Sequence, residues 1–578
     1  MTTDKGNRKN TAFSSNKKII IYAIIGIVII SAVVLAFGLT SNYSNLKNRT
    51  NSGNATFAQQ SSILQSKNDA INKFDKIFCG HSKANSNQFI TEYKLPYKCE
   101  MPLGIAIDDG SSTNANHSAS SAGKVWYVSG KNGSLGSYDI KNKKFDREHV
   151  IPLWKPRQSP IDYSQVWALK IDQKGNIWLT DEKQNALWRY IRSSQSFEMY
   201  PIPATSSAFG TTYPVSLDFD KNGDIYFVGI RSTSLWFGDV AKMKNNTSTG
   251  ISSIPMPVTG FKGIDPDLIS TGSLTIDTRH NVVWISMLAY PQKGQILRYH
   301  IDTKTFDTFD MPKLLTSPVG TVVDESGNLW VTDHGTSLFY MLNPLNNSIT
   351  LYVTSKASNR VFGGGNNTSP GSYYTLPYWI ETGPNGSILI NEHTGNKIAK
   401  FNPDEKTLIE YWIPTQNKAF SSCPVDNRTS NNSCGIANAL QFAASKKSNQ
   451  LWFTEWSENK IGKVDTTKPL PFYVAINSLD FVVDKGHSIN INVNVISNSS
   501  SAINLNMLSS GTFTPTGDLG NSTGIFSQDS ISIAPGQTKE ISYIFTPSSD
   551  LKPGDYTLML GAENNSVSYL RAVRVTIQ

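Results

Sequence analysis

Acidic and histidine side chains return at one position of a hairpin pattern that repeats along this chain. Three consecutive copies carry an acid there, and in two of them the next residue is a histidine, His334 or His393. Converging carboxylate oxygens can hold a hard cation, and an imidazole beside them can act as a general base near neutral pH. The pattern therefore predicts a metal-binding or acid–base site. Alignment of the seven copies places these residues in the shared position: Ser129, Asp181, Gly229, Met287, Asp333, Glu392 and Glu455.

A structural role explains the same acids without chemistry. An acid that closes a β-strand before a turn often accepts hydrogen bonds from the backbone amides of that turn. Asp181 occupies the position in a copy far from the three consecutive ones, where an acid alone would serve as a cap. Both interpretations stay open. If the cluster is catalytic, His393 is the better base, because its copy lies between the copies that carry Asp333 and Glu455.

The repeated hairpin is clearest at residues 451–464, LWFTEWSENKIGKV, where β-forming residues lead to an acid, a turn and a second short run. Successive copies lie roughly 45 to 65 residues apart, and a four-stranded propeller blade needs roughly 40–50 residues. Seven copies predict an all-β fold with a seven-bladed β-propeller over residues 76–470. The copies are marked by an aromatic residue or, once, a leucine: Trp126, Trp178, Tyr226, Trp284, Trp330, Leu389 and Trp452.

A strand-like segment stands outside these copies, before the first complete one. The sequence FITEYKLP, Phe89 to Pro96, matches LIEYWIP, Leu408 to Pro414, which reads as the outer strand of a blade. We therefore expect Phe89 to Pro96 to complete the last blade beside the Trp452 hairpin. Closing the ring in this way removes the exposed edges of an open sheet.

The hairpin at residues 451–464 resembles that of the virginiamycin B lyase (streptogramin lyase) family, whose blades repeat Trp-Phe-Thr-Glu, a turn, Asn and Ile-Gly-Arg. The resemblance covers roughly residues 99–465; Leu389 departs from it where the family has tryptophan, and Gly229 and Met287 interrupt the polar lining. The matching residues are Trp452, Phe453, Thr454, Glu455, Asn459, Ile461, Gly462 and Lys463.

The resemblance implies a chemistry. The family eliminates the ester linkage of a cyclic peptide antibiotic, using a histidine base and a divalent metal, usually magnesium, held partly by glutamates. By this likeness His393 and His334 are catalytic candidates, and Asp333, Glu392 and Glu455 are candidate Mg²⁺ ligands. A metal-bound carbonyl would ease loss of the neighbouring proton, which begins an elimination.

Two functions stay open, because propellers host many unrelated activities. One is a metal-assisted lyase that acts on an ester or a glycan-type substrate. The other is a non-catalytic surface module for binding or adhesion, which recognises a glycan, a peptide or an envelope protein at the propeller face. A nucleic-acid partner is not expected, because no basic stripe occurs in the predicted folded region.

Residues 471–578 show a different pattern, with short runs of alternating residues separated by turn signals. This is typical of a small antiparallel sandwich, and we expect an immunoglobulin-like β-sandwich after the propeller. The segment contains no cysteine pair and no cluster of acids and histidines.

The N-terminal region predicts membrane attachment. Residues 19–39 are apolar and uncharged, which is long enough for a transmembrane helix; a cleaved signal peptide is the rival, but its apolar core is normally shorter, roughly 7–15 residues. The basic tail, residues 1–18, should stay in the cytoplasm, and the polar residues 40–75 read as a flexible stalk. We thus expect a single-pass protein of the cell membrane with its bulk outside.

Cysteines and glycosylation sequons agree with an extracellular address. N-x-[ST] sequons recur from Asn42 to Asn564, so a glycoprotein is expected. The four cysteines permit three pairings. Their short spacings favour Cys79 with Cys99 and Cys423 with Cys434, each bridging one loop in an oxidising compartment. A zinc site is the lesser alternative, since no CxxC spacing occurs.

Overall fold

The structure of the protein is a computed structural model. It describes residues 57–80, 82–108, 123–154, 164–205, 210–356, 374–417, 435–445, 448–511 and 522–578. The basic tail, the predicted membrane segment 19–39 and the Cys423–Cys434 pair lie outside these ranges. Within them, no helix is both long and apolar enough to span a membrane. The chain divides into two compact units, residues 1–75 with 156–163 and residues 76–155 with 164–578.

Helix α3, Phe57–Phe78, corrects one expectation. The flexible stalk predicted over residues 40–75 is wrong for residues 57–75, which are helical. Leu64, Ile71 and Phe74 are spaced so that they share one face of a helix. The surrounding serine, asparagine and glutamine residues concealed this spacing in the composition.

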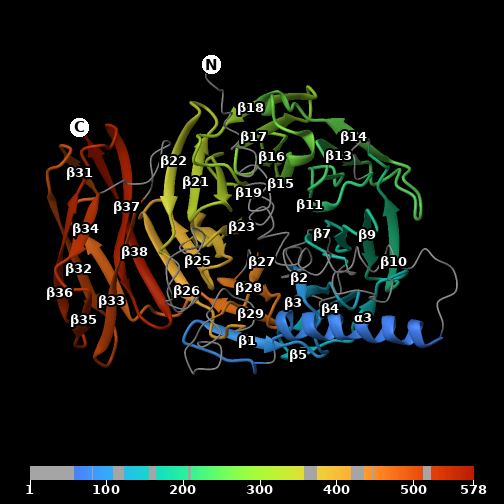
Figure 1. The fold of residues 1–578 in the computed structure, drawn as a ribbon, viewed down its shortest axis with the longest axis horizontal. Coiled ribbons are helices and arrows are strands. Elements are labelled where there is room, and N and C mark those ends of the chain that lie inside the picture. The colour runs from blue at the N-terminus through green and yellow to red at the C-terminus, as the bar shows by residue number, and fades with distance from the viewer. Residues whose placement is uncertain are drawn as a thin grey trace, which may run out of the picture. The chain divides into compact units, whose positions relative to one another are not determined.

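The larger unit is built from antiparallel β-sheets (Figure 1). In the described ranges seven sheets follow one another along the chain. The first four contain β2 (Pro102–Asp108), β3 (Lys124–Ser129), β4 (Ser134–Asp139), β5 (Lys144–Phe145) and β6 (His149–Val150); β7 (Leu169–Ile171), β8 (Ile177–Asp181), β9 (Ala186–Ile191) and β10 (Ser196–Pro201); β11 (Pro214–Phe219), β12 (Ile225–Gly229), β13 (Ser234–Gly238) and β14 (Ile251–Pro255); and β15 (Ser270–Asp277), β16 (Val282–Ala289), β17 (Lys293–His300) and β18 (Thr305–Asp310).

The remaining three sheets follow the same order. They contain β19 (Pro318–Val323), β20 (Leu329–Asp333), β21 (Leu338–Asn343) and β22 (Ser348–Val353); β23 (Pro377–Thr382), β24 (Ile388–Glu392), β25 (Lys397–Asn402) and β26 (Thr407–Trp412); and β27 (Ala439–Ala444), β28 (Gln450–Glu455), β29 (Lys460–Asp465) and β1 (Ile90–Lys94). Short 3-10 turns lie at η1 (Thr259–Phe261), η2 (Pro266–Leu268) and η3 (Pro384–Gly386).

These sheets form a β-propeller. Each sheet contacts the next one along the chain, and β27 of the last contacts β2 of the first. An Asp–Trp pair fixes two of the hairpins: Asp324 accepts hydrogen bonds from two backbone amides of its turn, and its other oxygen accepts the indole N–H of Trp330 at 2.8 Å. Asp172 and Trp178 repeat this bond at 2.9 Å. In these two sheets an aspartate after the first strand and a tryptophan of the second strand therefore hold the two strands together.

The last sheet is completed from the N-terminal side, as the sequence predicted. Strand β1 pairs with β29, with Ile90 opposite Val464 and Lys94 opposite Lys460. Phe89 and Ile90 are buried there. The predicted disulfide between Cys79 and Cys99 is confirmed, and it encloses the segment that carries β1.

The C-terminal residues form two sheets around one apolar core. One sheet contains β30 (Phe472–Ile476), β32 (Ile489–Ser497), β34 (Thr523–Phe526) and β36 (Thr538–Thr546); the other contains β31 (Asp480–Val483), β33 (Ile503–Gly511), β35 (Ser530–Ile533), β37 (Gly554–Glu563) and β38 (Val567–Ile577). Side chains of both sheets share a core that includes Val493 and Leu558. An immunoglobulin-like relationship stays a prediction.

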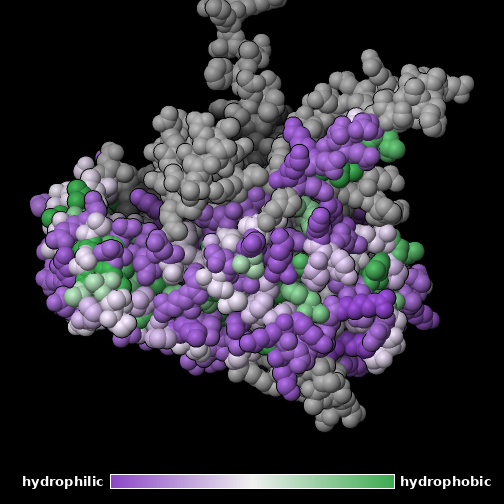
Figure 2. All heavy atoms as spheres, turned by 90° about the horizontal axis from the view of Figure 1, so that it is seen from below, coloured by the Kyte–Doolittle hydropathy of each residue, from purple (hydrophilic) through white to green (hydrophobic). Residues whose placement is uncertain are grey.

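Strand β38 also pairs with β26, the outer strand of the sixth propeller sheet. Leu408 pairs with Leu570 across this seam, and both side chains are fully buried. The sheet therefore runs without interruption from the propeller into the C-terminal region, which the sequence did not predict. Seen from below, the surface is mostly hydrophilic, with apolar residues in small groups (Figure 2).

Candidate active site

The two histidines singled out in the sequence lie side by side. His334 follows β20 and His393 follows β24, so neighbouring sheets bring them together. Their ring centroids are 5.3 Å apart and their planes differ by only 14°. His334 is 7% exposed and His393 is 1% exposed. The structure thus brings the two predicted catalytic residues together, at the end of the propeller where the first strand of each sheet begins.

The His334 ring is held in one orientation by backbone carbonyls. Its Nδ1–H donates to the carbonyl oxygen of Leu376 at 3.1 Å, with that of Pro377 at 3.3 Å. In a neutral ring this places the basic lone pair on Nε2. Burial lowers the pKa of His334 well below its ordinary value, and the neighbouring His393 lowers it further. His334 is therefore a neutral imidazole with a defined basic atom.

Several buried polar atoms around the histidines have no hydrogen-bond partner. Among the described residues, these include Nε2 of His334, both ring nitrogens of His393 and both amide atoms of Asn438. Burial also lowers the pKa of His393 to about 4. Each unmade hydrogen bond costs roughly 1–3 kcal/mol. Such a concentration of unsatisfied groups requires an explanation.

Two aromatic side chains and an acid extend this cluster away from His334. The ring of Tyr378 meets His334 edge-on at 5.1 Å and lies 5.7 Å from Trp167, whose indole N–H donates to Glu182 at 3.2 Å. Burial raises the pKa of Glu182 to about 7, although the bond from Trp167 opposes the rise. Tyr378 and Trp167 therefore connect the two neutral imidazoles with an acid that titrates near neutrality.

Sequence reasoning missed Glu182, Tyr378, Trp167 and Asn438. A signal existed for Glu182: it follows Asp181, and thus occupies the same repeat position as His334 and His393. Nothing comparable marked Tyr378, which reads as an ordinary aromatic residue of a strand.

Asp333 serves as the structural interpretation predicted. One carboxylate oxygen accepts hydrogen bonds from the Gly335 amide and the Thr336 hydroxyl, and the other accepts the Ser317 amide at 2.9 Å. Asp181 is satisfied in a similar way by a turn amide and the indole of Trp188. Burial raises the pKa of Asp333 to about 6. The short acids of this repeat position therefore cap turns.

Glu392 and Glu455 are placed differently. Neither carboxylate has a hydrogen bond within the described part of the chain, and both are fully buried. Each faces a buried lysine that begins the next strand: Lys397 near Glu392, and Lys460 at 3.9 Å from Glu455. Burial, followed by a second nearby glutamate, raises the pKa of both acids well above its ordinary value.

The three predicted metal ligands do not meet. Within the described ranges, no group of three acid, histidine or cysteine side chains that includes one of these carboxylates brings its ligand atoms within 4.8 Å of one another. The oxygens of Asp333 already accept three hydrogen bonds, while Glu392 and Glu455 face lysines of their own hairpins. The magnesium assignment stays a prediction made from the resemblance, and the carboxylates as placed do not form a site for it.

Buried acids also make stability depend on pH. Burial, together with nearby Glu148, raises the pKa of Glu100 to about 9, against 4.5 in the unfolded chain. The folded state thus keeps a proton that the unfolded chain releases, so this contribution is complete below pH 4.5 and is lost as pH rises through 9. His393, whose pKa is lowered to about 4, has the opposite effect on stability: its contribution is lost as pH falls below 6.5 toward 4.

We therefore expect the melting temperature to fall between pH 7 and pH 9. Glu100→Gln, which mimics the protonated acid, should flatten this slope in calorimetric scans, whereas Glu405→Gln at an exposed position should not. A slope that is equal in Glu100→Gln and the wild type would show that Glu100 is not the titrating group.

No protein-family model and no curated protein matches this chain. Solved structures that resemble it include a streptogramin B lyase, with 20% identity over 65% of this chain and 97% of that one and a TM-score of 0.46. A catalytically inactive virginiamycin B lyase from Staphylococcus aureus with quinupristin has 18% identity over 65% and 98%, with a TM-score of 0.46. The hydrazine synthase of Kuenenia stuttgartiensis has 9% identity over 68% and 100%, with a TM-score of 0.43.

Proposed function

We propose that the protein is an enzyme that removes a proton from carbon and eliminates a leaving group, a lyase reaction. The observation that carries this proposal is the stacked pair of neutral imidazoles. Nε2 of His334 is basic, buried and without a hydrogen-bond partner among the described residues. A substrate C–H placed at this atom would meet a base that is already deprotonated.

The residues around His334 divide the reaction between them. His334 Nε2 accepts the proton, the electron pair of the broken C–H bond forms the double bond, and the leaving group departs. Glu182 is half protonated near pH 7 and returns a proton to the leaving group. Burial keeps the pKa of His334 low, and His393 lowers it further because two adjacent imidazolium ions would repel each other. No step is assigned to a metal ion.

Cyclic depsipeptides and uronic-acid polysaccharides test this reaction, since both carry a proton next to a carbonyl and a leaving group one carbon further. Elimination opens a cyclic ester without a change in mass and creates an ultraviolet-absorbing double bond, whereas hydrolysis adds water. His334→Ala should lower turnover about 10²–10⁴-fold, while His487→Ala, at an exposed position of the C-terminal region, should retain it. Full turnover by His334→Ala, or a product that has gained water, contradicts the proposal.

The proposed enzyme is a membrane-anchored propeller outside the cell. We propose that the seven sheets are the blades of a seven-bladed propeller, that residues 19–39 hold it at the cell membrane, and that the ring lies outside the cell. The Cys79–Cys99 disulfide supports an oxidising compartment. A non-catalytic module for binding or adhesion is the second candidate, favoured by the C-terminal region that extends a propeller sheet.

A further inference from the structure

A cavity of about 560 Å³ lies in the ring, away from the histidines. Residues of the first strands β2, β7, β11, β19, β23 and β27 line it. Strand β23 shows which end of the ring this is. Pro377 at its start pairs with Glu392, the neighbour of His393 in sequence, whereas the cavity residues Glu381 and Thr382 lie at its other end. The cavity therefore belongs to the opposite end of the ring. Its volume falls in the range of small-molecule sites, roughly 300–1,000 Å³.

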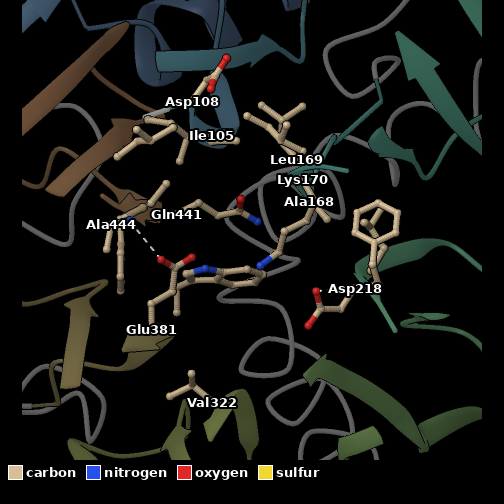
Figure 3. A pocket seen from close by; sticks show the side chains of 18 of the residues that line it. Ile105, Asp108, Ala168, Leu169, Lys170, Asp218, Val322, Glu381, Gln441 and Ala444 are labelled. Carbon is tan, nitrogen blue, oxygen red and sulfur yellow. Dashed lines mark hydrogen bonds between the residues drawn. The ribbon is translucent and has the colours of Figure 1, made fainter. Parts of the chain in front are cut away.

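A lysine and two carboxylates of different strands face this cavity (Figure 3). Burial acts to lower the pKa of Lys170, but the carboxylates of Asp218 and Glu381 outweigh it and raise the pKa above its ordinary value, so Lys170 is a cation. Asp218 accepts two backbone amides, and Glu381 accepts the Ala444 amide at 3.1 Å. These bonds fix both acids in position.

An unsatisfied donor lies among these charges. Gln441 on β27 is 2% exposed and lines the cavity, and its side-chain nitrogen has no hydrogen-bond partner in the described ranges. A buried amide N–H that the protein does not satisfy is costly unless a bound molecule accepts it. Figure 3 shows this side chain directed into the cavity, toward Lys170.

The other acids of the cavity are already occupied. Asp108 forms an ion pair with Arg192 at 2.7 Å, and Asp172 caps its own turn and accepts the indole of Trp178. Beside these two pairs, the cavity presents one cation, two hydrogen-bonded carboxylates and an amide, between walls that include Trp379 and Phe219.

We propose that this cavity binds a neutral polyhydroxylated ligand, namely the sugar units of an oligosaccharide. An anionic ligand would meet the carboxylates of Asp218 and Glu381, and a cationic one would meet Lys170. Hydroxyl groups both donate and accept, so they satisfy carboxylates, ammonium and amide together. The apolar face of a sugar ring can lie against the aromatic walls. The site is separate from the proposed catalytic end of the ring.

Calorimetric titration of the full-length protein with trisaccharides of different charge tests this site. The neutral set contains trisaccharides of cellulose, mannan and N-acetylated chitin; fully deacetylated chitotriose is the cationic probe and trigalacturonate the anionic one. At least one neutral trisaccharide should bind in preference to both charged ones. Lys170→Met and Gln441→Leu should each raise its Kd about tenfold or more, the effect of losing a buried polar contact.

Lys174→Met is the matched control, because this exposed lysine lies on the turn after β7 but does not line the cavity. It should bind as the wild type does. Thermal melts of each variant separate lost binding from lost folding, and Gln441→Leu should melt no lower than the wild type. The proposal is overturned if no neutral trisaccharide binds up to about 10 mM, if a charged one binds more tightly, or if folded Lys170→Met and Gln441→Leu retain wild-type affinity.

Discussion

Lys460→Met is expected to destabilise the protein by about 3–5 kcal/mol, the cost of leaving a buried charge without its partner. Lys460 is fully buried on β29, and its ammonium lies 3.1 Å from Glu92, 3.0 Å from Glu458 and 3.9 Å from Glu455. Three acids therefore depend on one cation. Because Glu92 belongs to β1, the loss also weakens the pairing that closes the ring.

Chemical denaturation measures this effect. Lys468→Met, at an exposed position a few residues further on, serves as the control and should change the free energy of unfolding little. Glu455→Gln should cost far less than Lys460→Met, because burial raises the pKa of Glu455 well above its ordinary value and glutamine keeps the charge and shape of the protonated acid. Equal denaturation midpoints for Lys460→Met and Lys468→Met would show that the cluster does not hold the ring closed.

Removal of residues 471–578 is expected to yield an insoluble or associating propeller. The outer strand β26 would lose its partner β38 and present an open row of backbone donors and acceptors, which promotes aggregation. Leu408 and Tyr411, both buried in the intact protein, would lose part of their cover. Size-exclusion chromatography of the truncated and intact proteins at matched concentration distinguishes the outcomes.

A monodisperse truncated ring with a single cooperative melting transition would contradict this expectation. Insertion of a short glycine–serine segment at the turn Lys485–Gly486 is a suitable control, since it alters the C-terminal region without touching β38. That variant should remain soluble and monodisperse.

The propeller could be predicted from sequence because each hairpin carries its own local signals. β-forming residues, a turn and an acid recur within a few residues of one another, and the closing strand was recognisable by its likeness to another outer strand. The β26–β38 seam had no such signal. Thr407 and Arg571 pair across a long stretch of chain, and either strand alone reads as an ordinary edge.

The candidate site was only partly predictable, because a repeat position fixes the backbone place of a residue but not the groups that its carboxylate contacts. Asp333 is short and reaches the amides of its own turn, whereas Glu392 and Glu455 are one methylene longer and face the lysines that open the next strand. Lys397 and Lys460 occupy matching places in their hairpins. The two histidines meet because adjacent sheets present the same position, which the alignment did contain.

The disulfide around the closing strand has a mechanical consequence. A pull on the chain before Cys79 passes through the sulfur bridge directly to Cys99 and on into β2. Residues 80–98, which include β1, lie between the two cysteines and carry none of this force, because the covalent path bypasses them. Tension on the N-terminal side therefore does not act on the hydrogen bonds between β1 and β29. The force can be transmitted while the last propeller sheet stays paired.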